Sequence, residues 1–318
     1  MNNILKSVNI CNKGGGTGSS VLLRGLKNCT DFLTAIVTVS DDGGSSGILR
    51  KELGVLPPGD FRNCVAALSD SENIIKELFD YRFDQGKGLK GHSLGNLLIA
   101  AMSDITGNFE EGLNQSAKIL GAKGTVLPSS LDDIVLQAKL TDGSQVNGES
   151  LIPLKKGKIS SVNLNPESAK GTDSAINALL KADLIIVGPG SLYTSLIPPL
   201  LVKDLTNVIK ESSALKIYIC NVATQKGETD GFSVYDHIVA IEQHTYKGIF
   251  DYIVADENDN TPITTHDETP ITISKNDQDN PKVLQFDIKS AEHSLRHDSN
   301  KLSNCIKKIY NLWINSSN

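Results

Sequence analysis

A glycine-rich turn near the N-terminus constrains the fold of this chain more than any other feature. The turn runs from Gly14 to Ser20 and reads Gly-Gly-Gly-Thr-Gly-Ser-Ser. The apolar stretch from Ile4 to Cys11 predicts a short buried strand before it, and Val21 to Leu26 predicts a helix after it. Proteins of the α/β class hold phosphates at such turns, because glycine lets the backbone approach the ligand and the helix N-terminus offers free N–H groups.

Two interpretations of this turn stay open. It is either a phosphate site, in which Thr17 or Ser19 bonds a phosphate oxygen, or a plain helix cap in a doubly wound fold. The Walker pattern is absent, since Lys13 precedes the glycines and no Gly-Lys-Ser/Thr follows them. The dinucleotide pattern Gly-x-Gly-x-x-Gly fails by one residue, because Ser19 stands in the third glycine position counted from Gly14.

The composition limits the classes of function. The chain has 318 residues, with 31 basic and 37 acidic side chains, a net charge of −6 and no basic run, which argues against a nucleic-acid partner. Its apolar stretches are too short to cross a bilayer, and no signal-peptide pattern opens the sequence. Five scattered cysteines without Cys-x-x-Cys spacing indicate reduced thiols rather than disulfides or a zinc site. We therefore expect a cytoplasmic protein without a membrane span.

Strand and helix patterns alternate through much of the chain. This alternation predicts a mostly parallel sheet covered on both faces, as in a three-layer α/β sandwich. The length allows one large domain or two small ones, and we interpret residues 1–318 as a single α/β domain. Between residues 124 and 164 the pattern changes to loose alternation with a turn at Asp142-Gly143, which predicts a small β-rich insertion. Apolar residues at helical spacing from Ser303 to Trp313 predict a closing helix.

Four polar or glycine-rich segments follow predicted strands. Ligands of open α/β sheets bind beyond the carboxyl ends of strands, so we expect these segments to meet at one edge of the sheet. Their glycines and hydroxyls are candidates for binding a phosphate, and their amides are candidates for contacting a base or sugar. The segments are 14–20, 40–46, 188–191 and 221–225; they supply the phosphate candidates Gly15, Gly16, Thr17, Gly18, Ser19, Gly190 and Ser191 and the base or sugar candidates Asn221, Thr224 and Gln225.

Three aspartates form the main group of carboxylates. Asp41 and Asp42 follow the predicted strand from Phe32 to Val39, and Asp60 follows a long glycine-rich loop. Two carboxylates together with substrate phosphates commonly hold Mg²⁺. In the alternative, Asp41 and Asp42 only bond nearby backbone amides and Asp60 only caps a helix. An acid after the second strand also suits a bound ribose, so a dinucleotide such as NAD stays open.

Further polar residues are candidates for ligand contacts. Arg62 and Asn63 carry donors for phosphate or sugar oxygens. His92 lies near a predicted helix start, either as a hydrogen-bonding residue or as a general base. Arg296 suits bidentate binding of a diphosphate, or else it pairs with Asp298. No Ser-His-Asp or Cys-His arrangement stands out by spacing, so no catalytic residue is assigned.

In these segments the chain resembles the CofD-like superfamily and, within it, the YvcK branch of gluconeogenesis factors. The matching motifs span residues 11 to 298 in the same order, and together they are very specific. Within them, His92 and Asn96 join Asn63 as candidates for contacting the sugar or base. The motifs are GGGTG at 14–18, SDDGGSSG at 40–47, LPPGDFRN at 56–63, GHSLGNL at 91–97, GPGSLYTS at 188–195, GETDG at 227–231 and RHD at 296–298.

The resemblance implies a Rossmann-like fold and a cytoplasmic protein needed for growth and normal cell shape on gluconeogenic carbon sources. For the YvcK branch it implies binding of uridine-diphosphate (UDP) sugars. Relatives in the CofD branch transfer a phospholactyl group from a guanosine-diphosphate-linked donor to a deazaflavin, and acids at the places of Asp42 and Asp60 look like metal ligands there. The chain departs from the family at Lys13 and Ser19, where apolar residues are usual.

Three hypotheses follow for function. The first is a regulatory factor for gluconeogenic growth, cell shape and cell-wall metabolism that binds a UDP sugar, with Arg296 clamping the diphosphate. The second is a Mg²⁺-dependent transferase of the 2-phospho-L-lactate transferase type, with Asp42, Asp60 and, as a further candidate, Asp41 at the metal. The third, an NAD-dependent oxidoreductase, rests on the near-miss glycine pattern. The sequence leaves open GDP as the nucleotide, a homo-oligomer, and phosphorylation at Ser299 beside Arg296.

Overall fold

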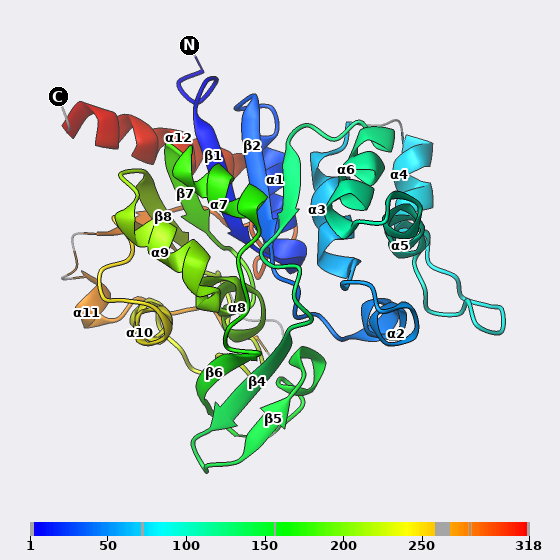
Figure 1. Cartoon of the computed structure of the whole chain (residues 1–318). Helices are drawn as coiled ribbons and strands as arrows, with labels where there is room; N and C mark the ends of the chain where they lie inside the picture. Colours follow the sequence, from blue (N-terminus) through cyan, green and yellow to red (C-terminus); the bar gives the residue numbers. More distant parts are fainter. Residues whose placement is uncertain are drawn as a thin grey trace.

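A parallel sheet forms the centre of the molecule (Figure 1). The computed structural model describes residues 3–70, 73–155, 157–257, 268–278, 280 and 282–316. Within these residues, seven strands pair in the order β10-β9-β8-β7-β1-β2-β3, and every pair is parallel. The predicted parallel sheet is confirmed. Its strands are β1 (Asn9–Gly14), β2 (Phe32–Val37), β3 (Thr125–Pro128), β7 (Leu184–Val187), β8 (Leu215–Ile219), β9 (Tyr252–Asp256) and β10 (Val283–Phe286).

The strand order reverses between β1 and β7. From β1 the chain continues outward to β2 and β3, and after its return to β7 it continues the other way to β8, β9 and β10. All four residues of β7, Leu-Ile-Ile-Val, are buried, as expected for a parallel strand with both faces covered. A crevice for a ligand is therefore expected beyond the carboxyl ends of β1 and β7.

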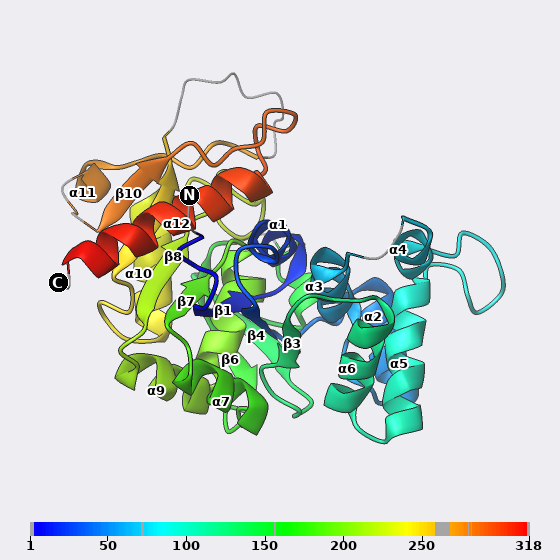
Figure 2. The same cartoon turned by 90° about the horizontal axis from the view of Figure 1, so that it is seen from above.

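Helices cover both faces of the sheet. Seen from above, α1 (Gly16–Leu26), α3 (Gly59–Leu68) and α12 (Ser299–Ser316) lie on one side, and α7 (Asp173–Leu180) and α9 (Lys203–Glu211) lie on the other (Figure 2). The predicted closing helix is confirmed by α12, which buries Leu302, Ile306 and Ile309 on one face. These layers confirm the Rossmann-like three-layer sandwich.

The remaining helices pack around the sheet: α6 lies against β3 at one edge, and α8 lies against the central strand β1. Near β3, α5 packs against α6, and the approach is close because a Cβ at Gly112 would lie 2.5 Å from the Ser103 amide nitrogen. The helices not yet bounded are α2 (Gly44–Leu53), α4 (Asn73–Asp80), α5 (Leu94–Thr106), α6 (Phe109–Ile119), α8 (Ile197–Leu201), α10 (Val234–His244) and α11 (Lys275–Gln278), with the short turns η1 (Glu149–Leu151) and η2 (Leu192–Leu196).

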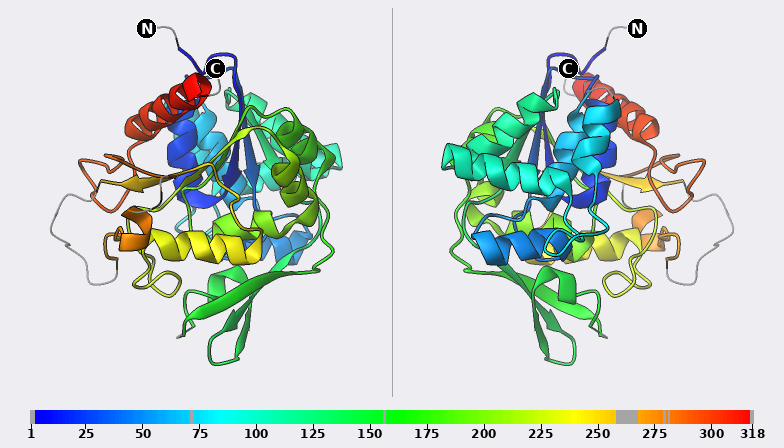
Figure 3. Two further views of the ribbon diagram at one scale, coloured as in Figure 1. Left: turned by 90° about the vertical axis from the view of Figure 1, so that its left-hand side faces the viewer. Right: turned by 90° about the vertical axis from the view of Figure 1, so that its right-hand side faces the viewer.

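A small antiparallel sheet projects from the carboxyl edge of the large one (Figure 3). In the described part of the chain it contains β4 (Val135–Leu140), β5 (Gln145–Asn147) and β6 (Ile159–Asn165), in the order β5-β4-β6. A β-rich element is thus present where the sequence predicts one. The predicted range 124–164 is too wide at its start, because β3 pairs with β2 in the large sheet. A four-residue strand shows too little periodicity to be assigned to either sheet from its sequence.

The first strand begins later than the apolar pattern predicts. Residues 4–7 form a turn, and β1 starts at Asn9, so the predicted strand from Ile4 to Cys11 is wrong in its first half. Leu5 and Val8 are buried although they lie outside the strand. They are apolar because they belong to the hydrophobic core, and not because they lie in a strand. The strand continues to Gly14, so Lys13 belongs to β1 itself.

The composition leads to expectations about the cysteine thiols and about membrane-spanning helices. All five cysteines are free and buried, and burial raises the pKa of Cys11 and of Cys220 to about 12, which keeps these thiols protonated. Among the described residues, none of the helices combines the length and the apolar character that crossing a bilayer requires.

Lys13 is the most unusual residue of the core. Its side chain is fully buried in a central strand, and its Nζ has no hydrogen-bond partner among the described residues. Burial lowers the pKa of Lys13 to about 7, which the nearby Cys11 thiol only partly opposes. The lysine therefore costs stability, and this cost depends on pH.

We expect Lys13→Met to stabilise the protein by about 1–3 kcal/mol at pH 7, because an apolar side chain of similar length replaces an unpartnered amine. The unfolded chain keeps the Lys13 proton up to pH about 10.5, whereas the fold releases it near pH 7. Between these values the unfolded state binds more protons, so wild-type stability rises with pH and the advantage of Lys13→Met shrinks. Urea unfolding at pH 7 and pH 9 measures this. An advantage equal at both pH values would contradict it, and exposed Lys51→Met is the control.

Candidate functional site

A cavity of about 160 Å³ lies at the carboxyl ends of β1, β7 and β8, where the strand order reverses. Three of the four segments expected to meet at this edge, 14–20, 188–191 and 221–225, contribute most of its wall, together with the chain around Arg296. The fourth segment, 40–46, contributes none of the lining residues, so the predicted convergence is present for three of the four strand-end segments. The lining residues are Gly15, Gly16, Thr17, Gly18, Gly190, Ser191, Ser195, Asn221, Val222, Ala223, Thr224, Gln225, Glu268, Leu295, Arg296 and His297.

The first glycine turn presents backbone to this cavity. Helix α1 begins at Gly16 with Gly15 at its N-cap position, and neither Thr17 nor Ser19 caps it with a side chain. Thr17 is exposed and lines the cavity. Ser19 points into the protein: it is buried, and its Oγ has no hydrogen-bond partner among the described residues. Of the two hydroxyls predicted to reach a phosphate, the structure brings only that of Thr17 to the cavity.

Close contacts explain why this turn requires glycine. A Cβ at Gly18 would lie 2.5 Å from the carbonyl oxygen of Pro189, which belongs to the turn after β7. A Cβ at Gly15 would collide with the carboxylate of Asp60. A larger residue at position 18 would therefore push the turns after β1 and β7 apart and open the wall of the cavity, and one at position 15 would displace the Asp60 side chain.

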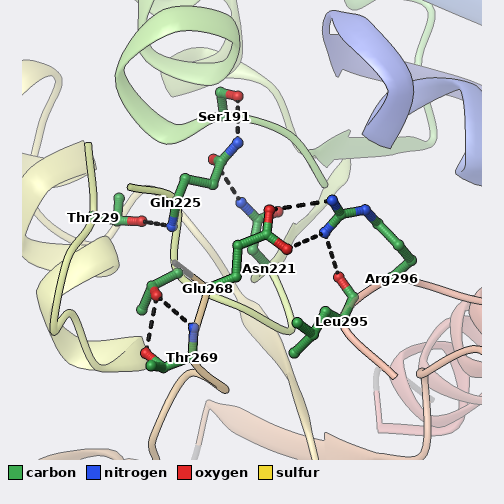
Figure 4. Close-up of polar contacts among 9 residues, drawn as sticks. Ser191, Asn221, Gln225, Thr229, Glu268, Thr269, Leu295 and Arg296 are labelled. Atoms are coloured by element: carbon green, nitrogen blue, oxygen red, sulfur yellow. Dashed lines mark hydrogen bonds and ion pairs between the residues drawn. The ribbon is translucent and has the colours of Figure 1, made fainter. Parts of the chain in front are cut away.

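Amide side chains connect the turn after β7 to the end of β8 (Figure 4). Asn221 accepts a hydrogen bond from the Gly190 amide at 3.1 Å and donates one to the Gly190 carbonyl at 2.8 Å. Gln225 donates to the Ser191 hydroxyl at 2.7 Å. The Thr224 amide donates to the Thr269 carbonyl at 2.7 Å, and the Thr269 amide donates to the Thr224 hydroxyl at 3.1 Å. The three residues predicted to contact a base or sugar, Asn221, Thr224 and Gln225, therefore hold the cavity wall together.

Arg296 lies across the cavity and binds a carboxylate. Its Nη1 donates to Glu268 Oε2 at 2.8 Å and its Nη2 donates to Glu268 Oε1 at 3.2 Å (Figure 4). The predicted alternative, a pair with Asp298, does not form, because Asp298 accepts hydrogen bonds from the amides of Asn300 and Lys301 at the start of α12. The guanidinium of Arg296 therefore already adopts the two-pronged geometry that binds a carboxylate or phosphate.

A second cavity of about 480 Å³ adjoins the first. The two share Ser191, Gln225 and Glu268 in their walls. The second is rich in carboxylates, since the side chains around it include those of Asp41, Glu149 and Glu228. Its full lining is Asp41, Glu149, Ser150, Pro153, Ser191, Thr194, Gln225, Lys226, Glu228 and Glu268.

Partly buried carboxylates gather between this second cavity and the first glycine turn, together with the buried Glu228. Burial, and then the charge of Asp41, raises the pKa of Asp60, which accepts a hydrogen bond from the Gly16 amide. Burial also raises the pKa of Glu149 well above its usual range, together with the charges of Asp60 and Asp41. Glu228 accepts hydrogen bonds from Thr194, yet burial raises its pKa to about 6. This mutual repulsion favours a cation or hydrogen-bond donors among these groups.

Of the two adjacent aspartates predicted as metal candidates, Asp41 rather than Asp42 lies beside Asp60. Asp41 interacts with Asp60, whereas Asp42 turns toward the small sheet and accepts a hydrogen bond from the Ser150 amide at 2.8 Å. Asp41 also accepts from the Gly43 amide at 2.9 Å. Asp60 lies inside α3, whose N-cap is Pro58, so it does not cap that helix. Within the described ranges, the acid, histidine and cysteine side chains include no group of three placed to hold a metal as they stand.

Three predicted contacts to the sugar or base lie outside both cavity walls. His92 is buried, and its Nδ1 shares a hydrogen bond of 3.0 Å with the Ser45 hydroxyl. Asn63 accepts a hydrogen bond from Arg62, and Asn96 is buried in the first turn of α5. The structure does not bring Asn63, His92 and Asn96 to either cavity.

Comparison with known proteins places the chain in a family. Residues 10–296 match the family model described as 2-phospho-L-lactate transferase CofD. The chain is 52% identical over 250 residues to a gluconeogenesis factor of Halalkalibacterium halodurans, which covers 79% of this chain and 78% of that protein. The chain belongs to the CofD family, among its gluconeogenesis factors.

Other members of the CofD family agree with this assignment. A putative gluconeogenesis factor of a Nostoc species is 57% identical over 229 residues, which cover 72% of this chain but only half the length of that relative. A crystal structure of a UPF0052-family protein from Bacillus halodurans superposes with a TM-score of 0.89 at 45% identity, covering 95% of this chain and 99% of that one. The fold and the family are therefore shown over nearly the whole chain.

Glu149, Glu228 and Glu268 are the site residues that sequence reasoning missed. Glu228 lies within the GETDG motif of the CofD-family resemblance, so its position could have been found there. Glu149 lies on the short turn η1 between β5 and β6 of the small sheet, and Glu268 lies in no motif. Only the folded chain brings these acids beside the glycine turns.

We expect Gly18→Ala to destabilise this CofD-family chain by about 1–3 kcal/mol, because the new methyl group would overlap the Pro189 carbonyl. Gly43→Ala is the matched control, since its Cβ would lie 3.4 Å from the nearest atom, an ordinary contact. Neither glycine has a positive φ, so the comparison measures space rather than backbone strain. Chemical denaturation of both variants provides the measurement. Equal stability of the two would show that the turns after β1 and β7 can separate without cost.

Proposed function

We propose that this chain is a cytoplasmic regulatory factor that binds a nucleoside-diphosphate sugar, with a UDP sugar as the first candidate, and acts in gluconeogenic growth, cell shape and cell-wall metabolism. The observation that carries the proposal is the pair of adjoining cavities at the switch point of the sheet. The names of the relatives support the link to gluconeogenesis.

The first cavity suits the diphosphate. It combines the N-terminus of α1, the exposed Thr17 hydroxyl and the Arg296 guanidinium, all of which donate hydrogen bonds to anions. Its volume of about 160 Å³ is below the range of about 300–1,000 Å³ typical of ligand pockets. A complete nucleotide sugar therefore needs the adjoining cavity as well.

The second cavity suits a sugar without negative charge. Carboxylates of Glu149 and Glu228 accept hydrogen bonds, which sugar hydroxyls donate. Another carboxylate on the ligand would be repelled by these acids and by Asp41. We therefore place the nucleotide diphosphate in the first cavity and an uncharged sugar in the second.

The hydrogen bonds of the serine and threonine hydroxyls in the two cavities favour ligand binding over nucleophilic catalysis. The Ser191 hydroxyl accepts from the Gln225 amide, and the Thr194 hydroxyl donates to Glu228. His297 faces the Cys220 carbonyl, and burial lowers its pKa to about 4, so it stays neutral at physiological pH. In the described walls of both cavities, these contacts pair no serine or threonine hydroxyl with a histidine.

Calorimetric titration with UDP-glucose, UDP-N-acetylglucosamine, GDP and NADH tests the proposal. We expect micromolar binding of the UDP sugars and at least about tenfold weaker binding of UDP-glucuronate than of UDP-glucose, because only the uronate carries an extra carboxylate into the acidic cavity. Arg296→Gln should weaken the binding of all these nucleotides. Failure of every UDP sugar at millimolar concentration would refute the proposed function, whereas equal binding of the uronate would refute only the placement of the sugar.

A Mg²⁺-dependent transferase of the CofD type is a second candidate, favoured by the buried acids beside the glycine turn. Burial and then the charge of Asp41 raise the pKa of Asp60, and burial and then the charges of Asp60 and Asp41 raise the pKa of Glu149. Carboxylate oxygens are the ligands that Mg²⁺ prefers. The donor set fits the ion in chemistry. When bound, Mg²⁺ would neutralise charge on the diphosphate. We place it with Asp60 and Asp41 rather than with Asp42.

Thermal unfolding with and without Mg²⁺ tests this second candidate. We expect 5 mM Mg²⁺, roughly a hundredfold excess over a dissociation constant of about 50 μM, to raise the wild-type melting temperature by several degrees. Asp60→Asn should melt higher than wild type in EDTA, since one buried charge is gone, and should lose the response to Mg²⁺. Asp42→Asn should keep it. A response lost in Asp42→Asn but kept in Asp60→Asn would reverse the assignment.

A further inference from the structure

We propose that Glu268 is a specificity residue that occupies the phosphate position on Arg296 and yields it only to a ligand with at least two anionic groups. This proposal rests on the proposed function and names the charge that the ligand must carry. It assigns a role in selection to a residue that lies in no recognised motif. The pairing is local to the first cavity, whose wall includes both residues.

The geometry of the pair is that of a bound anion. Two nitrogens of the Arg296 guanidinium donate to the two oxygens of Glu268, at 2.8 and 3.2 Å (Figure 4). This parallel fork is the arrangement in which arginine also binds phosphate. Among the described residues, the Arg296 guanidinium makes one further hydrogen bond, from Nη1 to the carbonyl of Leu295. A phosphate that uses both prongs of the guanidinium must therefore replace the Glu268 carboxylate.

The two partners come from separate parts of the chain, and both are anchored. Behind Glu268, the Thr269 amide donates to the Thr224 hydroxyl at 3.1 Å and the Thr224 amide donates to the Thr269 carbonyl at 2.7 Å. On the other side, the Arg296 carbonyl accepts a hydrogen bond from the Ser290 amide at 2.8 Å. Exchange of carboxylate for phosphate therefore requires rotation of side chains only.

The exposure of the pair makes such an exchange feasible. The Arg296 side chain is 63% exposed and that of Glu268 is 29% exposed, so water screens their attraction. A singly charged ligand only replaces one exposed ion pair by another and gains little. A diphosphate gains more, because a second group remains for the N-terminus of α1 across the cavity. Glu268 thus selects against monoanions.

The wall shared by the two cavities gives the displaced carboxylate a place. Glu268 lines the second cavity as well as the first, so its side chain can leave Arg296 and remain within the site. There it adds to the carboxylates of Glu149 and Glu228. Binding of the diphosphate in one cavity therefore makes the other more negative, which strengthens its preference for an uncharged or cationic group.

A double-mutant cycle with inorganic pyrophosphate and UDP as probes tests the proposal. Calorimetry compares wild type, Glu268→Gln, Arg296→Gln and the double variant. We expect Glu268→Gln to bind both probes about two- to fivefold more tightly, the range that an exposed ion pair contributes. We expect Arg296→Gln to bind them about tenfold more weakly, and Glu268→Gln to give no further gain in that background. All four proteins should bind uridine, which has no phosphate, with the same affinity.

Controls separate this role from a general effect of charge. Glu292→Gln removes the same charge from an exposed position nearby in the chain and should leave pyrophosphate binding unchanged. If Glu268→Gln also tightens binding in the Arg296→Gln background, the effect comes from the general electrostatic field, and the proposal is overturned. If the probes bind but Glu268→Gln does not tighten their binding, the proposal is overturned as well. Failure of pyrophosphate and UDP to bind any variant would refute the proposed function and this inference with it. Melting temperatures confirm that each variant folds.

Discussion

The contact between the two glycine turns at the switch point is the constraint on which the rest of the structure depends. Gly18 lies so close to the Pro189 carbonyl that no larger residue fits. Strands β1 and β7 are neighbours in the sheet but far apart in sequence, so this contact fixes where the two halves of the fold meet. The N-terminus of α1, Asn221 and Arg296 face one cavity only because the turns remain in contact.

The same packing places an acid where a phosphate site needs donors. Asp60 fits against Gly15, where a side chain would collide with it, and already accepts the Gly16 amide hydrogen. A diphosphate at this turn therefore shares its donors with a buried carboxylate. A cation between the two, or binding through Thr17 and the turn after β7 instead, resolves the conflict. The two candidate functions differ in which of these solutions the protein uses.

The sequence predicts the features of this site that depend on local pattern. Alternating periodicity gives the parallel sheet, and the rule that ligands bind at the carboxyl ends of strands brings the glycine turns and Asn221 to one edge. Arg296 follows no predicted strand and is a candidate because its guanidinium suits a diphosphate. Loop geometry is not encoded locally in this way. Which of Asp41 and Asp42 faces inward depends on the backbone after β2, and Glu268 reaches Arg296 only through pairing of its segment with the end of β8.

Charge divides the site into two parts that suit different ends of one ligand. One wall offers backbone N–H groups and a guanidinium, and the adjoining cavity offers carboxylates that repel each other. An exposed ion pair such as that of Arg296 and Glu268 adds little to stability, so stability alone does not account for its place at the boundary. Its position matters because exchange at Arg296 moves negative charge from one cavity toward the other. A ligand with an anionic centre and an uncharged pendant group satisfies both parts at once.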